Sequence, residues 1–236
     1  MFNFPDSPAA VSAALSDHNY LTDEGLSTVV YLAMTMQRPL FLEGDAGVGK
    51  TELAKVLAAW TGGELIRLQC YEGIDASQAL YEWDYTRQLL HLRTAEASGR
   101  AESDSKSIED ELYSDRFLIR RPLLQAIDYS GEHRPVLLVD EVDRADDEFE
   151  AFLLEVLSDH SVTIPELGTL GGGKPPLVVV TSNRTRDVHD ALKRRCLYHW
   201  VNHPDLEREI EIIRLKSPQA DAALARQVAL AVQAMR

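Results

Sequence analysis

The chain has 236 residues, of which 45% are hydrophobic, and its 38 acidic against 24 basic residues leave a formal net charge of −14. This length allows one substantial domain with part of a second, and the acidic balance argues against nucleic acid as a partner, since a negative surface repels phosphates. No apolar stretch approaches the roughly 20 residues that span a bilayer, and residues 1–6 lack the start of a signal peptide, so we expect a cytoplasmic protein with no membrane span.

Short apolar runs recur along the chain and predict five strands, at residues 39–43, 65–68, 136–139, 177–180 and 198–201. Runs that are continuously apolar, rather than alternating, are typical of strands covered by helices on both faces. Stretches of helix-forming residues lie between them, and the plainest, residues 52–60, follows the first strand directly. The order predicts an α/β fold with a mostly parallel sheet.

Three stretches depart from this alternation. Residues 95–115, rich in Ser, Glu and Asp, are predicted to form an exposed loop or a frayed insertion. Residues 162–176 contain three consecutive glycines and predict a hairpin or a flexible excursion before the fourth strand. From Asp205 the pattern becomes helical, and Ser217 with Pro218 predicts the N-cap and first position of another helix that continues to the last residue.

The strongest chemical signal is a glycine-rich loop between the first strand and the following helix, which matches G-x-x-x-x-G-K-[ST]. The glycines let backbone N–H groups converge on phosphate oxygens, and the helix N-terminus adds positive charge. We expect Lys50 to reach the β- and γ-phosphates of a nucleotide and Thr51 to offer its hydroxyl to Mg²⁺. The loop consists of Gly44, Asp45, Ala46, Gly47, Val48, Gly49, Lys50 and Thr51.

The third strand ends in the acidic pair Asp140 and Glu141, at the carboxyl edge of the predicted sheet. There Asp140 is predicted to hold the Mg²⁺ shell, and Glu141 to orient and deprotonate the attacking water. Acids are common at strand ends, so this pattern takes its meaning from the phosphate loop. An acid directly after the magnesium ligand favours hydrolysis over transfer to a second substrate.

Two further features complete the predicted site. Asn183 ends the fourth strand, where it would help to position water beside the γ-phosphate, although a turn-forming Asn is an equal reading. The basic pair Arg194 and Arg195 precedes the fifth strand and suits a transition-state phosphoryl group bound by a neighbouring subunit. A solvated basic face is the alternative for this pair.

In this order, the phosphate loop, the Asp-Glu strand end, the strand-end Asn and the late Arg resemble the AAA+ ATPases. Within them, FLEGDAGVGKT (residues 41–51) and VDEVDRA (139–145) are similar to the MoxR group. The phrases QCYEG (69–73), YEWDY (81–85) and RFLIRRPL (116–123) resemble its CoxD-like branch. The likeness extends over most of the chain.

The resemblance implies a P-loop AAA+ domain over residues 1–204, with a five-stranded parallel sheet flanked by helices, and the start of a C-terminal helical lid over 205–236. It also implies a ring, usually a hexamer, with ATP bound between subunits. Glu141 would be the catalytic acid, Asn183 the first sensor, and Arg195 or Arg194 the finger that reaches the next subunit. The chain reaches only the beginning of the lid, without the family's second sensor arginine, so we expect a truncated chain or an absent lid.

The resemblance further implies a client protein. In this family two insertions tend to face the ring's pore and engage clients, and they match residues 74–92 and 158–176. CoxD-like proteins are linked to maturation of the molybdenum–copper site of carbon monoxide dehydrogenase, often beside a von Willebrand A-type partner. We therefore expect ATP hydrolysis coupled to remodelling or maturation of a client metalloenzyme.

Two other functions remain open. The first is a motor on nucleic acid or a McrB-like, restriction-type GTPase, which the acidic balance opposes. The second is a non-catalytic module that uses nucleotide as a structural switch. The presence of Lys50 together with Asp140 and Glu141 opposes this second function, because a module without catalysis has no need of the acid.

Some weaker patterns also allow two readings. Cys196, His199 and His203 would suit copper or zinc, but without a fourth ligand nearby we favour ordinary strand and turn residues. The purine contacts in this fold come largely from backbone and apolar groups near the start of the chain, where Tyr20 and Leu21 are candidates.

The alternating aromatic side chains of Tyr81, Trp83 and Tyr85 form one more pattern with two readings. They mark either a surface that grips a client or the packing of an inserted hairpin.

Overall fold

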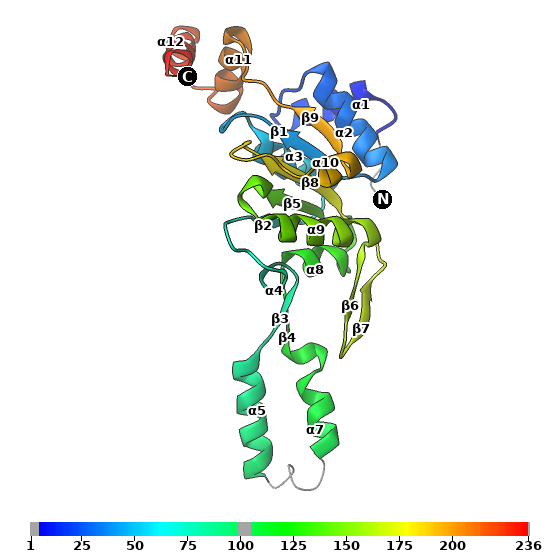
Figure 1. The fold of residues 1–236 in the computed structure, drawn as a ribbon. Coiled ribbons are helices and arrows are strands. Elements are labelled where there is room, and N and C mark those ends of the chain that lie inside the picture. Colours follow the sequence, from blue (N-terminus) through cyan, green and yellow to red (C-terminus); the bar gives the residue numbers. More distant parts are fainter. Residues whose placement is uncertain (1–4, 99–104, 236) are drawn as a thin grey trace.

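The computed structural model describes residues 5–98 and 105–235, and within these ranges five parallel strands form the central sheet (Figure 1). Their order across the sheet is β2–β5–β8–β1–β9. All five predicted strands are thereby confirmed, as is the α/β class. Their bounds are β1 Leu40–Glu43, β2 Leu65–Gln69, β5 Val136–Asp140, β8 Leu177–Ser182 and β9 Leu197–Trp200.

The three inner strands β5, β8 and β1 are buried along their whole length, as their continuous apolar runs predict. Alternate residues point to opposite faces of the sheet, so that Leu137 and Val139 join one hydrophobic cluster and Val136 and Leu138 the other. In the parallel register, Leu138 pairs with Val179. The sheet therefore separates two cores and aligns the ends of its strands.

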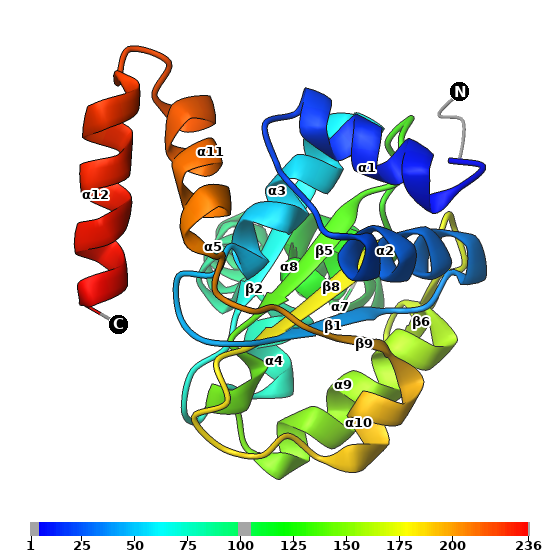
Figure 2. The ribbon, with the colours of Figure 1, turned by 90° about the horizontal axis from the view of Figure 1, so that it is seen from above.

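Helices cover both faces of the sheet (Figure 2). One face carries the two N-terminal helices and the helix after the phosphate loop, whose apolar residues form one cluster with the sheet. The other face carries three further helices, whose apolar residues join the second cluster. The first group is α1 Pro8–Asp17, α2 Glu24–Met36 and α3 Lys50–Thr61, and the second is α8 Pro122–Ile127, α9 Asp147–Asp159 and α10 Asp190–Arg195.

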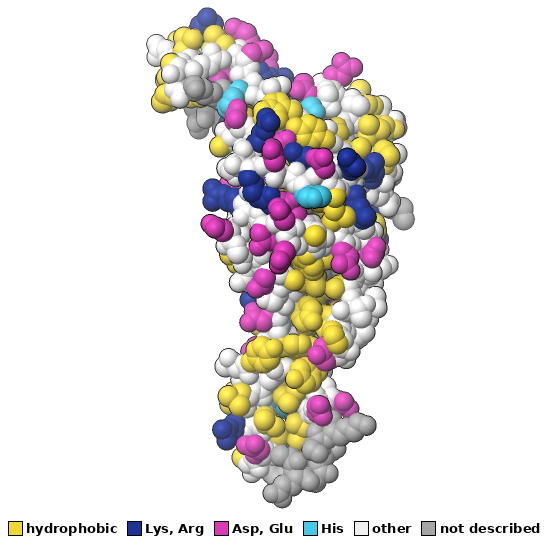
Figure 3. All heavy atoms as spheres, viewed as in Figure 1, with side chains coloured by type: hydrophobic (Ala, Val, Ile, Leu, Met, Phe, Trp, Pro, Cys, Tyr) yellow, Lys and Arg dark blue, Asp and Glu magenta, His cyan; other side chains and the backbone are white. Residues whose placement is uncertain are grey.

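A long insertion between β2 and α8 projects away from the sheet (Figure 1). Its base is an antiparallel strand pair, and its far part consists of two helices that lie side by side. Figure 3 shows hydrophobic side chains gathered toward the base of this projection, whereas charges of both signs cover the sheet-bearing part of the same face. The insertion comprises α4 Ala76–Ala79, β3 Tyr81–Trp83, α5 Tyr85–Ala97, α7 Ser105–Leu112, the 3₁₀ helix Asp115–Phe117 and β4 Leu118–Arg120.

The prediction of a loop over residues 95–115 is wrong for most of this stretch, although residues 99–104 lie outside the described part. Helix α5 continues to Ala97, and α7 buries the side chain of Ile108, which is 3% exposed. The two helices are also joined by Gln88 Nε2, which donates to the Leu112 carbonyl at 2.6 Å. The acid-rich composition of α7 concealed its narrow apolar face.

The three alternating aromatic side chains of this insertion do not all pack in the same way. Trp83 is buried and meets Tyr113 edge-on at 5.4 Å between ring centroids, and Tyr81 packs against the main core. Tyr85, in contrast, is 66% exposed. Packing of the inserted hairpin therefore explains Tyr81 and Trp83, and a gripping role is left to Tyr85.

The predicted hairpin before β8 is confirmed. It consists of β6 Ser161–Ile164 and β7 Gly168–Gly171, paired antiparallel with Val162 opposite Leu170. Gly168 adopts a φ of 82° after the turn, a conformation that favours glycine.

The last two helices, α11 Leu206–Lys216 and α12 Ala222–Ala234, pack on each other and stand beside α3 (Figure 2). The prediction that Ser217 and Pro218 open the final helix is wrong. Ser217 instead ends α11, and Asp221 caps α12 by accepting from the Leu224 N–H at 2.7 Å. An Asp carboxylate is an equally good cap, and it lies closer to the apolar repeat of this helix.

Among the described residues, no helix is long and apolar enough to cross a membrane. Residues 1–4, part of the stretch inspected for a signal peptide, lie outside the described range. The division into residues 1–204 and 205–236 remains a prediction.

Candidate nucleotide site

The phosphate loop joins the end of β1 to the start of α3, as the sequence predicts. Gly49 is the residue before the helix and has a φ of 98°, which a side chain would strain. A Cβ at Gly44 would lie 2.3 Å from the carbonyl oxygen of Val201, so only glycine fits against the strand end there. The loop therefore curls tightly at the N-terminus of α3, where backbone N–H groups and the helix dipole favour an anion.

Lys50 lies folded against its own loop. Its Nζ donates to the carbonyl of Gly44 at 2.6 Å and to that of Asp45 at 2.7 Å, and the residue is 5% exposed. Burial lowers the pKa of Lys50, an effect that the nearby carboxylates of Asp143, Asp45 and Asp140 oppose. The ammonium thus sits among the loop's carbonyl oxygens, at the mouth of the anion-binding turn.

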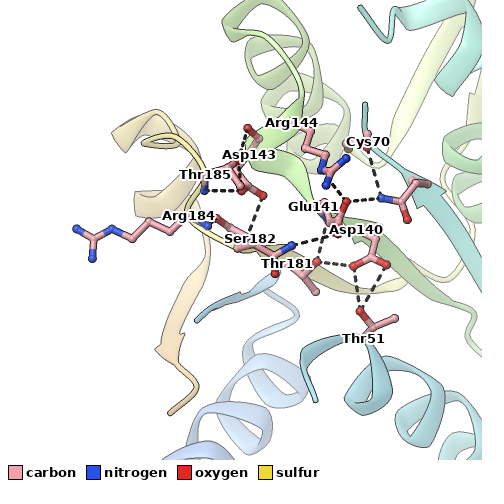
Figure 4. A network of polar contacts seen from close by, with 12 residues as sticks. Thr51, Cys70, Asp140, Glu141, Asp143, Arg144, Thr181, Ser182, Arg184 and Thr185 are labelled. Atoms are coloured by element: carbon pink, nitrogen blue, oxygen red, sulfur yellow. Dashed lines mark hydrogen bonds and ion pairs between the residues drawn. The ribbon is translucent and has the colours of Figure 1, made fainter. Parts of the chain in front are cut away.

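Asp140 accepts hydrogen bonds from two hydroxyl groups, one on α3 and one on β8 (Figure 4). Thr51 Oγ1 donates to Asp140 Oδ1 at 3.1 Å, and Thr181 Oγ1, from the adjacent strand β8, donates to the same oxygen at 2.6 Å. Thr181 also accepts from the Glu141 N–H at 3.0 Å. Since parallel strands end at one edge, the sheet brings Thr51 and Asp140 together as predicted.

Glu141 follows in a left-handed conformation, with φ 56° and ψ 51°, which turns its side chain away from that of Asp140. Its Oε1 accepts from Asn183 Nδ2 at 3.1 Å, and its Oε2 accepts from Gln69 Nε2 at 3.1 Å. Arg144 Nε forms an ion pair with Oε2 at 2.9 Å. The structure therefore places Asn183 directly beside Glu141, and adds Gln69 and Arg144, which sequence reasoning did not single out.

A second buried carboxylate, Asp143, fixes the loop that carries Asn183 (Figure 4). It accepts from the N–H groups of Asn183 at 3.2 Å and Thr185 at 2.8 Å, and from the Thr185 hydroxyl at 2.7 Å. Burial alone would raise the pKa of Asp143, but these hydrogen bonds outweigh it and hold the pKa below its usual value. Asp143 is thus a support for the position of Asn183.

Two cavities meet at the phosphate loop. The smaller, about 300 Å³, is lined by Lys50, Thr51, Asp140, Glu141 and Asn183, among others. The larger, about 560 Å³, shares Gly47, Gly49 and Glu52 with it and extends toward the N-terminal segment and α11. The smaller cavity suits the phosphates of a nucleotide, and the larger cavity suits its base.

Tyr20 and Leu21, the candidates for purine contact, both line the larger cavity. Tyr20 donates its hydroxyl to the Gly49 carbonyl at 3.3 Å, and burial raises its pKa above the ordinary value for a tyrosine. Its ring therefore forms a neutral wall beside the phosphate loop.

Helix α11 closes one side of this larger cavity with two polar contacts. Arg208 Nη2 donates to the Thr22 carbonyl at 2.6 Å, and Lys216 Nζ pairs with Glu52 Oε1 at 2.5 Å. The hydrogen bond from Lys216 lowers the pKa of Glu52. Helix α11 thus touches both the N-terminal segment and the helix of the phosphate loop.

Arg194 and Arg195 lie elsewhere. They end α10, just before β9 begins beside Leu40, whereas the phosphate loop follows the opposite end of β1. Arg195 donates to the Ser158 hydroxyl on α9, and Arg38 donates to the carbonyl of Arg194 at 2.8 Å. Within one chain, the structure therefore does not bring this pair to Glu141.

The residues Cys196, His199 and His203 have separate surroundings. Cys196 is buried, which raises the pKa of its thiol to about 12, and His203 pairs with Asp45 at 3.1 Å. Burial lowers the pKa of His199, whose ring lies against Gly25. Among the residues that the structure describes, no group of three or more His, Cys, Asp or Glu side chains is arranged to hold a metal ion.

The oxygen donors at the phosphate loop do fit a magnesium nucleotide. The Thr51 hydroxyl and the Asp140 carboxylate lie 3.1 Å apart, and such hard oxygen groups suit Mg²⁺. The curled loop and the Lys50 ammonium supply the positive side of a phosphate site. Because these features share one cavity, the chain's own residues are compatible with both the ion and the nucleotide.

Comparison with known proteins identifies the family. The model of the AAA domain (dynein-related subfamily) matches residues 39–196, well over half of the chain. The chain belongs to this AAA family. The matched span begins before the phosphate loop and ends just after Arg195, so it contains nearly all of the predicted site residues and the whole order of motifs.

The fold is also similar to the crystal structure of a protein from Cytophaga hutchinsonii named "putative ATPase", with a TM-score of 0.52 and 16% sequence identity. The match covers 86% of this chain and 56% of that protein, so the present chain spans little more than half the length of this relative. At this identity the likeness concerns the fold alone.

Proposed function

We propose that this AAA domain hydrolyses ATP to ADP and phosphate and couples the reaction to remodelling of a client protein. The observation that carries the proposal is the Asn183–Glu141 contact at 3.1 Å, in the same cavity as Thr51, Asp140 and Lys50. A general base next to an amide, beside a phosphate loop, is an arrangement for activating water.

The residues divide the chemistry among them. Lys50 and the loop N–H groups bind the phosphates, and Thr51 with Asp140 would hold Mg²⁺, which when bound offsets the charge that develops on the phosphoryl oxygens. Glu141 takes a proton from water as the water oxygen bonds to the γ-phosphorus. The bond to the leaving oxygen breaks at the same centre, and ADP departs with the electron pair. Asn183 holds the carboxylate of Glu141 toward this water.

We further propose that the active form is a homo-oligomer, with a hexamer expected, and that the finger comes from a neighbouring subunit. The distance of α10 from the phosphate loop within one chain supports a role across an interface. Arg194 is the better candidate, because Arg195 is bound to Ser158, whereas the exposed Arg194 side chain has no hydrogen bond or ion pair within the described part of the chain.

The client is proposed by resemblance. The MoxR and CoxD-like phrases favour maturation of a metalloenzyme such as a molybdenum-containing dehydrogenase, with a von Willebrand A-type partner. The projecting insertion and the β6–β7 hairpin supply two surfaces for such contacts. A preference for GTP, or stimulation of turnover by DNA or RNA, would instead favour the nucleic-acid motor or the McrB-like enzyme.

The test is ATP turnover of the purified chain beside two variants. Glu141→Gln is expected to bind ATP but to lose turnover by about a hundredfold or more, since it cannot accept the proton. Lys50→Ala is expected to lose nucleotide binding. Glu148→Gln, an exposed acid on α9, is the matched control and keeps wild-type turnover. Full turnover in Glu141→Gln would show that the proposed base is wrong.

A further inference from the structure

Arg67 contacts the carboxylate proposed to hold magnesium, and no function described so far accounts for it. It lies on the edge strand β2, where the sequence shows it as a charged interruption of an apolar run. Its Nη2 approaches Asp140 Oδ2 to 2.5 Å and its Nε approaches the same oxygen to 3.1 Å. Both donors of the guanidinium edge thus converge on one oxygen.

The surroundings of Asp140 make this contact more than a surface ion pair. The Asp140 side chain is 4% exposed, so its charge needs a partner, whereas the Arg67 side chain is 52% exposed and remains free to move. The other carboxylate oxygen, Oδ1, accepts from the hydroxyls of Thr181 and Thr51, which carry no net charge. Arg67 therefore supplies a counter-charge in direct contact with this buried acid, and the Lys50 ammonium lies near the same carboxylate.

We propose that Arg67 is a positioning residue that competes with the divalent cation for Asp140 and so sets the magnesium requirement of nucleotide binding. The proposal rests on the proposed function. A guanidinium and Mg²⁺ are attracted to the same carboxylate, and a cation that approaches Asp140 is repelled by the guanidinium or must displace it. Arg67 holds Oδ2 of Asp140 while Oδ1 accepts from Thr51, at the cost of a weaker cation site.

The same side chain is connected to the catalytic glutamate. Arg67 Nη2 donates to Gln69 Oε1 at 2.5 Å, and Gln69 Nε2 donates to Glu141 Oε2 at 3.1 Å. Displacement of the guanidinium from Asp140 therefore removes a restraint from Gln69, which contacts Glu141. Cation binding at Asp140 is in this way linked to the conformational freedom of the Glu141 side chain.

The experiment measures ADP affinity of the full chain by calorimetry over a series of free Mg²⁺ concentrations. In Arg67→Gln, the Mg²⁺ concentration that gives half of the gain in ADP affinity is expected to fall about tenfold, because a charge-assisted contact no longer competes. Arg67→Lys keeps the charge but loses the two-point contact, and about a threefold fall is expected. Arg93→Gln, an exposed arginine on α5, is the matched control and leaves the value unchanged.

Thermal unfolding gives a second readout that does not depend on turnover. In EDTA, Arg67→Gln is expected to melt below the wild type, since Asp140 is left buried without its counter-charge, and Mg²⁺ with ADP should recover more stability in the variant than in the wild type. If Arg67→Gln does not fold, Arg67→Lys decides the matter by the same titration.

The outcomes separate the two hypotheses. A folded Arg67 variant that binds ADP with an unchanged or higher Mg²⁺ requirement overturns the competition. A wild-type chain that binds no ADP at any Mg²⁺ concentration overturns the proposed function, and this inference with it.

Discussion

At the scale of single residues, Asp143 shows how a side chain without a direct chemical role supports the site. It is 2% exposed and accepts three hydrogen bonds from Asn183 and Thr185. These bonds fix the backbone of Asn183, whose side chain contacts Glu141. Since hydrogen bonds to a charged acceptor are worth about 1.5–3 kcal/mol each and are not additive, their joint loss is a large fraction of a domain's stability.

Asp143→Ala is therefore expected to lower the free energy of unfolding by about 3 kcal/mol and to reduce ATP turnover, because the loop of Asn183 loses its anchor. Asp143→Asn keeps the shape and one acceptor oxygen, and a loss of about 1 kcal/mol is expected. Urea unfolding at pH 7 measures both. Equal stability of Asp143→Ala and the wild type would contradict this role.

The pH dependence of this residue has a definite sign. The hydrogen bonds hold the pKa of Asp143 below its unfolded value, so its contribution to stability is present above that unfolded value and is lost as pH falls through the folded pKa. The stability difference between the wild type and Asp143→Asn should therefore narrow below about pH 4. Around neutral pH, well above both pKa values, this difference in the free energy of unfolding should not change with pH.

Much of the site was predictable at this scale because of one rule: parallel strands end at a common edge. This rule brings Thr51, Asp140 and Asn183 together from three distant segments, as expected. It does not say which way a long side chain on the edge strand will turn. Arg67 and Gln69 were therefore missed, although an arginine in an apolar strand was a visible signal.

At the scale of elements, the insertion between β2 and α8 depends on one aromatic contact. Trp83 lies on β3 where it is 7% exposed, and it meets Tyr113 at the end of the α7 segment. Its loss opens a cavity where the insertion joins the cluster on one face of the sheet, which also contains Leu137 and Val139. The consequence should spare the cluster on the other face, to which Trp83 does not belong.

Trp83→Ala is expected to weaken the insertion by about 3–5 kcal/mol, which exceeds what such a unit can lose and remain closed. Hydrogen exchange should then show loss of amide protection in α5 and α7, while α2 and α3, on the other face of the sheet, keep theirs. Tyr85→Ala, which removes an exposed ring from the same insertion, is the control and leaves protection unchanged. An equal loss of protection throughout the sheet would show that the insertion is not an independent unit.

Two elements, α7 and the start of α12, were predicted wrongly from the sequence. Helix α7 carries so many acidic residues that its composition resembles a loop, and Ile108, the buried residue among its described side chains at positions 107–112, gives no periodic signal. The start of α12 was misplaced because Ser217 with Pro218 and Asp221 are both acceptable helix starts. Local propensity left two choices there, and the packing of α12 on α11 selects the second.

At the scale of the whole molecule, the separation of the proposed arginine finger from Glu141 within one chain is the main argument for the proposed assembly. The phosphate loop and Glu141 lie at one end of the strands, and the arginines of α10 lie at the other. In a closed ring, a heterologous contact places one end of each subunit against the opposite end of the next. The two halves of the site would then meet at every interface.

Mixing of two inactive variants tests this arrangement. Arg194→Ala has an intact base but offers no finger, and Glu141→Gln offers a finger but has no base. At equal, random mixing, an active site needs the first variant at the phosphate side and the second at the finger side, so about a quarter of wild-type turnover should return. Arg195→Ala in place of Arg194→Ala is the matched control, and it is expected to be active by itself, since Arg195 is bound to Ser158 within its own chain. If Arg195→Ala is instead inactive by itself and regains turnover when mixed with Glu141→Gln, the finger is Arg195. If Arg194→Ala is inactive and regains no turnover in the mixture, it does not act across the interface.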